Sequence, residues 1–162
     1  MLTREQFLPH EMRIVAALRM QGASDEQVIV RVKSENLFQY PTERMVANRA
    51  TVCLRRLDAM VPTDAVCAAR GIDPKTAVEA ASYLTRLMAS GTPTQADQAI
   101  FYSMICRYDI VRELVLVEVG ERLQNFDYAF TAVDLNAFMT RFTTEYPDAA
   151  RWTEATVKRI KG

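Results

Sequence analysis

Histidine, glycine and cysteine are all scarce in this chain of 162 residues, and their scarcity argues against several classes of function. His10 is the only histidine, which is too little for a His-based catalytic dyad or a typical zinc site. The five glycines are isolated from one another, so no Gly-rich loop is present to cradle a phosphate. We therefore expect a protein that is not an enzyme and that needs no metal and no cofactor.

The three cysteines, Cys53, Cys67 and Cys106, are odd in number, widely spaced and set in apolar helical contexts. This pattern does not fit a disulfide framework, so we expect three buried thiols in a reducing compartment.

No segment has the composition of a signal peptide or a membrane span. Charge arrives within the first five residues, where a signal peptide would begin an uncharged apolar run. The most apolar stretch, 110–119, is interrupted by Arg112, Glu113 and Glu118 and is shorter than the roughly 20 apolar residues that a span needs. We expect a cytoplasmic protein that makes no membrane contact.

The net charge of zero hides an uneven distribution along the chain. Residues 1–60 hold nine Lys and Arg against seven Asp and Glu, residues 61–150 hold seven against twelve, and residues 151–162 hold four against one. Two basic ends flank an acidic middle, so an anionic partner is confined to part of the surface.

Helix caps and breaks follow one another along the whole chain, and no segment alternates for long enough to predict a strand. Ser24 with Gln27 forms a capping box, Thr42 can cap a long helix, and Asp73 precedes a proline at a first helical position. The expected helices are 9–20, a helix opened by Ser24, about 42–60, 63–70, 74–89, 95–108, 109–123, one around 135–142, and a final one after Thr153.

These helices predict an all-α fold, a compact multi-helix bundle that forms one domain over residues 1–162. A sub-division into an N-terminal helical unit, 1–62, and the remaining helices, 63–162, is open at this point. We expect the helices at 95–108 and 109–123 to form the central core, and the stripe of Leu135, Phe138, Met139 and Phe142 to be core as well.

The helix from about residue 42 to residue 60 carries Arg44, Arg49, Arg55 and Arg56, and no acidic residue lies between these arginines. With about 100° per residue, Asn48, Thr51 and Arg55 fall close to Arg44 on one outward stripe, and Arg49 and Arg56 fall to one flank. The opposite face gathers apolar residues: Val46, Ala50, Cys53, Leu57 and Met60. Arginine, asparagine and threonine suit phosphates and base edges, so this stripe suggests nucleic-acid binding.

Two features leave that interpretation open. Amphipathic helices often expose arginines, and Glu43 or Asp58 could neutralise the arginines locally. The helix opened by Ser24, a turn and the arginine helix have the layout of a helix-turn-helix unit, but the turn is longer than is typical. Within the turn we expect Phe38 in the core, whereas Tyr40 could either stack on a ligand or hold the turn.

Several short motifs resemble those of a known family. The N-terminal set is Glu35-Asn36-Leu37-Phe38, Thr42, Arg44 and Leu54-Arg55-Arg56-Leu57, and the C-terminal set is Trp152-Thr153-Glu154-Ala155-Thr156-Val157-Lys158. In order and spacing these sets are similar to the signatures of the BrxA family, small proteins of bacterial BREX phage-defence systems. The helix from Ile110 to Leu123 occupies the place of the family's apolar central segment, and the match runs from about Met12 onward.

The resemblance implies an all-helical fold related to the NusB antitermination fold, a cytoplasmic location and no known catalytic centre. It also implies binding to double-stranded DNA in a system that contains other BREX proteins. Family members usually continue beyond the basic C-terminal helix, so we expect this chain to be a truncated or a naturally short form.

The hypothesis from the sequence is non-enzymatic binding of duplex DNA with weak sequence specificity. Arg44, Arg55 and Arg56 would contact phosphates, with Arg49 beside them, and Asn48 and Thr51 would lie close to the backbone or a groove. A second basic patch would consist of Lys158, Arg159 and Lys161. The alternative is a helical protein–protein adaptor that docks through the arginine face or through Phe138 and Phe142. An RNA-binding role would rest on the fold analogy alone.

Overall fold

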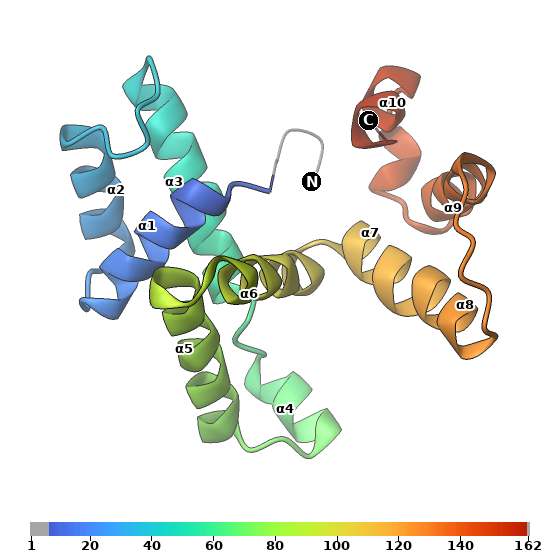
Figure 1. Cartoon of the computed structure of the whole chain (residues 1–162), viewed down its shortest axis with the longest axis horizontal. Helices are drawn as coiled ribbons and strands as arrows, with labels where there is room; N and C mark the ends of the chain where they lie inside the picture. Colours follow the sequence, from blue (N-terminus) through green and yellow to red (C-terminus); the bar gives the residue numbers. More distant parts are fainter. Residues whose placement is uncertain (1–6, 162) are drawn as a thin grey trace. The chain divides into compact units, whose positions relative to one another are not determined.

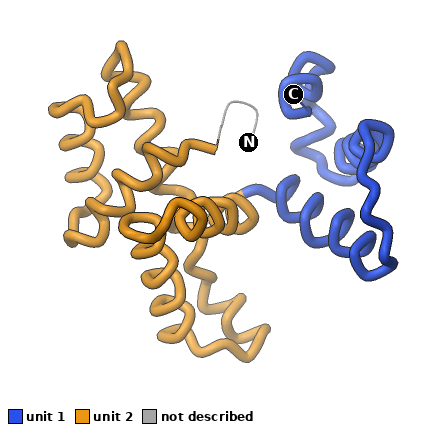
Figure 2. Tube along the Cα trace, in the orientation of Figure 1, with its two compact units in different colours: residues 1–6, 108–162 blue, residues 7–107 orange. Residues whose placement is uncertain are grey.

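The computed structural model describes residues 7–161, and every regular element in that range is helical (Figure 1). The all-α class expected from the sequence is therefore confirmed. The described chain divides into two compact units, an N-terminal unit of residues 7–107 and a C-terminal unit of residues 108–161 (Figure 2).

The N-terminal unit consists of α1 (Pro9–Met20), α2 (Asp25–Ser34), α3 (Glu43–Asp58), α4 (Asp64–Arg70), α5 (Pro74–Ser90) and α6 (Pro93–Arg107). Several of these helices begin at the N-terminal capping residues that the sequence indicated. Ser24 and Gln27 form the capping box of α2, Thr42 accepts a hydrogen bond from the Met45 amide at 3.3 Å, and Asp73 accepts one from the Thr76 amide at 2.8 Å.

The core of the N-terminal unit joins helices that are far apart in the sequence. Helices α5 and α6 pack against α1, and α6 also packs against α3. Met12, Val46, Cys53, Met88 and Ile100 are all fully or almost fully buried in one cluster. Residues 63–107 therefore lie in the same compact unit as the first helices.

The C-terminal unit begins with one continuous helical stretch that changes its winding: α7 (Asp109–Arg112), the π-helix η1 (Glu113–Val119) and α8 (Gly120–Gln124). After a loop come α9 (Ala132–Glu145), the short 3-10 helix η2 (Ala149–Arg151) and α10 (Glu154–Lys161). Phe138, Met139, Phe142 and Ala149 are buried, as expected for the aromatic stripe of α9.

The expectation that residues 109–123 form a central core is wrong for most of that stretch. Ile110 and Val111 are buried, but no residue of η1 is. A π-helix has an extra residue in each turn, so apolar side chains spaced for an α-helix no longer share one face.

Across residues 7–161, no helix has both the length and the apolar content that crossing a membrane requires.

Candidate nucleic-acid interface

The arginine helix α3 lies next to α2, and the two are joined by a turn that side chains hold in shape. Asn36 and Gln39 have left-handed backbone conformations, with φ of 41° and 56°. The Asn36 amide group donates to the Tyr40 carbonyl at 3.1 Å, and its side-chain oxygen accepts from the Tyr40 amide at 3.2 Å. Phe38 is buried, as expected, and so fixes the turn to the core.

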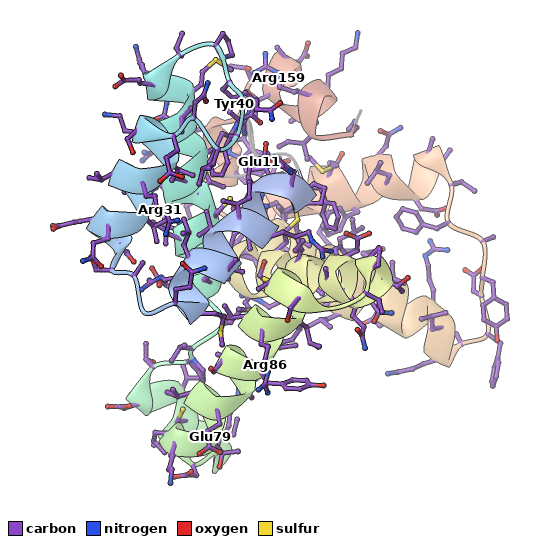
Figure 3. All side chains as sticks on the ribbon, turned by 60° about the vertical axis from the view of Figure 1, so that its left-hand side comes forward. Glu11, Arg31, Tyr40, Glu79, Arg86 and Arg159 are labelled. Carbon is purple, nitrogen blue, oxygen red and sulfur yellow. The ribbon has the colours of Figure 1, made fainter. Side chains whose placement is uncertain are left out.

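Tyr40 is the second anchor of this turn. Its hydroxyl donates a hydrogen bond to Oε1 of Glu11 at 2.5 Å, and the two side chains point toward each other in Figure 3. The hydrogen bond to Glu11, followed by burial, raises the pKa of the Tyr40 hydroxyl above its ordinary value of 10.0. Of the two roles left open by the sequence, holding the turn is therefore the one that these contacts support.

The outward stripe of α3 is arranged as the helical spacing predicts. Arg44, Asn48 and Arg55 are exposed, and Thr51 is half-buried. The hydroxyl of Thr51 donates to the Ala47 carbonyl at 2.9 Å, so its hydrogen is already engaged within the helix. The apolar face is buried at Val46, Ala50, Cys53, Leu57 and Met60.

Arg56 does not lie on this surface, which corrects the expectation that it contacts phosphates. Its side chain is 0% exposed, and its Nη1 donates to the Phe7 carbonyl at 2.9 Å. Arg56 falls about 120° around the helix from Arg44, a flank position. In the tertiary structure the Phe7 carbonyl lies against Arg56 on that flank. Arg49, on the same flank, is half-buried. Its positive charge partly offsets the rise in the pKa of Tyr40.

The acids closest to the arginines in the sequence are engaged by other cations. Glu43 pairs with Lys33 at 3.2 Å, and Asp58 pairs with Arg19 at 3.1 Å. Within residues 7–161, Arg44 and Arg55 form no ion pair, so the stripe keeps its positive charge.

The second basic patch expected from the sequence lies on α10, in the C-terminal unit. Thr153 accepts a hydrogen bond from the Thr156 amide at 3.3 Å and so caps the helix. Lys158 and Arg159 are exposed, whereas the exposed Lys161 donates to the side-chain oxygen of Asn136 at 2.7 Å. This patch belongs to the C-terminal unit and the α3 stripe to the N-terminal unit.

The apolar face that the sequence suggested for protein docking is buried, because Phe138 and Phe142 are only 2% and 4% exposed. The exposed aromatic side chains of the C-terminal unit lie instead on the loop after α8, at Phe126, Tyr128 and Phe130. Sequence reasoning missed this feature. The available signal was three aromatic residues at alternating positions in a segment without helical periodicity.

The family model of BrxA matches the chain over residues 1–162. No curated protein and no solved structure matches it.

Proposed function

The chain belongs to the BrxA family and is therefore a component of BREX phage defence, and we propose that it serves there as a non-enzymatic DNA-binding protein. It would contact duplex DNA through Arg44, Asn48 and Arg55 of α3, with Arg49 and Thr51 beside them. The α10 patch of Lys158, Arg159 and Lys161 would add a second contact. The proposed setting is the cytoplasm, with other BREX proteins as further partners.

The observation that carries this proposal is the outward stripe of α3 without neutralising acids. From Arg44 to Arg55 the helix rises by about 16 Å, comparable with the roughly 12 Å width of the DNA major groove. Two arginines at this spacing can reach phosphates on the two edges of a groove, with Asn48 between them. Phosphate contacts position a protein without reading sequence, so we expect weak sequence specificity.

We further propose that α2, the turn and α3 act as a helix-turn-helix-like unit, and that the fold is related to that of NusB. The packing of α2 against α3 supports the first part. The turn of residues 35–42 is long for such a unit, but it is anchored at both Phe38 and Tyr40.

A titration of labelled duplex DNA at several salt concentrations tests the proposal. If about three to five phosphates are neutralised, the slope of log affinity against log salt should be about −3 to −4.5. Arg44→Ala combined with Arg55→Ala should lower the affinity and make the slope shallower by about 2. Arg86→Ala is the matched control, because Arg86 is an exposed arginine of the same unit on α5.

A flat salt response, or an affinity that the double substitution leaves unchanged, would contradict the proposal. Competition of the labelled duplex by duplex RNA and by single strands identifies the preferred nucleic acid. We expect unlabelled duplex DNA to be the strongest competitor, and stronger competition by duplex RNA would replace DNA with RNA as the ligand.

A further inference from the structure

The segment from the end of α8 to the start of α9 carries several large apolar side chains that are exposed to solvent. Phe126 and Tyr128 are 78% and 74% exposed, and Val133 is 75% exposed. Leu123 and Phe130 are exposed as well. We call these five residues, Leu123, Phe126, Tyr128, Phe130 and Val133, the aromatic segment. Large exposed apolar groups that are close in the chain are typical of a binding surface.

One arginine holds this segment in a defined conformation. Arg122 donates from Nη1 to Asp127 at 2.6 Å and to the Ala129 carbonyl at 2.9 Å, and from Nη2 to Asp134 at 2.7 Å. Its guanidinium also lies 5.5 Å from the centre of the Phe130 ring. The loop is thus tied both to α8, which carries Arg122, and to α9, which carries Asp134.

The backbone at Phe126 is strained, since its φ of 59° lies in the left-handed region that non-glycine residues rarely adopt. Such a conformation costs free energy and persists only where the surroundings hold it. Here two backbone hydrogen bonds at the end of α8 hold it, from the Phe126 amide to the Leu123 carbonyl at 3.2 Å and from the Asp127 amide to the Arg122 carbonyl at 2.9 Å. The side chain of Phe126 is directed to the surface. A loop that is ordered before it binds loses little conformational entropy on binding.

Charge identifies the kind of partner. Residues 121–134, which carry the aromatic segment, contain three acidic residues, Glu121, Asp127 and Asp134, against one basic residue, Arg122, which pairs with Asp127 and Asp134, so the stretch keeps a net negative charge. This charge repels nucleic-acid phosphates, and it also opposes symmetric pairing with a second copy, in which the same acids would face one another. The negative charge favours a partner whose surface carries Lys and Arg around an apolar centre.

We infer that the aromatic segment is a docking site for a protein segment of another chain that presents an apolar face bordered by lysine and arginine. Phe126 and Tyr128 supply the apolar anchors, and the surrounding acids select the basic border. The aromatic segment belongs to the C-terminal unit and the proposed DNA-binding stripe to the N-terminal unit, and the inference does not rest on the proposed function.

A labelled amphipathic helical peptide of about 18 residues, with leucines at i, i+3, i+4 and i+7 spacing and lysines elsewhere, is the probe. Fluorescence anisotropy with the full chain should give saturable binding that is weakened by added salt. The matched control peptide has glutamate in place of every lysine, and it should bind at least about tenfold more weakly.

Two variants test the residues. Phe126→Ser with Tyr128→Ser should raise the Kd of the lysine peptide at least about tenfold, since aromatic anchors dominate interface energies. Tyr83→Ser is the control, because Tyr83 is an aromatic residue of the other unit that is 52% exposed on α5, and it should leave the Kd unchanged. Arg122→Gln keeps every aromatic residue but removes the clamp, so it should raise the Kd several-fold through lost order.

Several outcomes would overturn the inference. These are equal binding of the two peptides, no saturable binding, and a Kd that the serine variant does not change. A dimer in sedimentation that the serine variant abolishes would make a second copy the occupant, and a loss of duplex DNA binding in that variant would make DNA the occupant. A Tm lowered by several degrees in the serine variant would show that the chain itself already covers the segment.

Discussion

The hydroxyl of Tyr40 and the carboxylate of Glu11 are joined by a hydrogen bond of 2.5 Å between residues 29 positions apart in the chain. Glu11 lies in the first turn of α1 and is only 7% exposed. Tyr40 lies in the turn that leads into α3. The contact therefore ties the turn before the candidate DNA-binding helix to α1, and Phe38 ties the same turn to the apolar core.

Replacing Tyr40 by phenylalanine tests this tie. Tyr40→Phe leaves the ring in place but removes the hydrogen bond to a largely buried carboxylate, so we expect the free energy of unfolding to fall by about 1–3 kcal/mol. Urea denaturation measures it. A change below about 0.5 kcal/mol would show that solvent replaces the bond without cost.

The raised pKa of Tyr40 gives a pH dependence with a definite sign. The folded state holds the neutral phenol more strongly than the unfolded state does. Its contribution to stability is complete below the unfolded pKa of 10.0 and is lost as the pH rises through the higher folded pKa. Burial and neighbouring groups also raise the pKa values of Tyr102 and Tyr146, so tyrosinate absorbance should show several groups that titrate late, and Tyr40→Phe should remove one of them. A late titration of unchanged amplitude in that variant would show that Tyr40 is not one of these groups.

Substitution by alanine should lower stability at Arg56 and DNA affinity at Arg44. Arg56→Ala empties a fully buried site and leaves the Phe7 carbonyl without this donor, so we expect it to cost about 3 kcal/mol of unfolding free energy. Arg44→Ala, at an exposed position, should change stability by less than about 0.5 kcal/mol and lower DNA affinity. Thermal denaturation and DNA titration of both variants separate the two roles. Equal stability losses would contradict the difference in burial.

Two glycines provide a matched pair. A Cβ at Gly91 would lie 2.5 Å from the Leu87 carbonyl oxygen, so Gly91→Ala should destabilise the chain by about 1–3 kcal/mol. A Cβ at Gly120 would meet only the Val115 carbonyl oxygen at 3.6 Å, and the φ of −60° suits alanine. Gly120→Ala should therefore be neutral or stabilising by up to about 1 kcal/mol. The two Tm values, compared with that of the natural chain, check both expectations.

Acid should loosen the aromatic segment. Hydrogen bonds from Thr131, with the Arg122 charge contributing, hold the pKa of Asp134 below its ordinary value of 3.8. A lowered folded pKa means that the contribution to stability is present above the unfolded value and is lost as the pH falls through the folded value. The protection factors of the loop amides, which correct for the intrinsic pH dependence of hydrogen exchange, should therefore fall at pH values below 3.8.

In that experiment Asp134→Asn should show faster exchange already at neutral pH, with little further change in acid. Asp148→Asn is the control, because Asp148 is an exposed carboxylate outside the Arg122 contacts, and it should behave as the natural chain does. Loop protection factors that are independent of pH in the natural chain would contradict the role of Asp134.

Local features were predictable because they depend on neighbours in the chain. Ser24, Thr42 and Asp73 cap the helices that follow them, since a cap needs only its own side chain and an amide three residues later. The outward stripe of Arg44, Asn48 and Arg55 likewise follows from the helical repeat. The family was also recognisable from short motifs, and the family model extends it to residues 1–162.

The sequence by itself thus determined the helical class, the caps, the apolar face of α3 and the family. Only the tertiary structure decided which charges remain at the surface. It buried Arg56 beside Phe7, and it paired Glu43 with Lys33 and Asp58 with Arg19. It also left the residues of η1 without a buried side chain. The physical reason is that helical periodicity sets the direction of a side chain, whereas the packing of distant segments determines what that side chain meets.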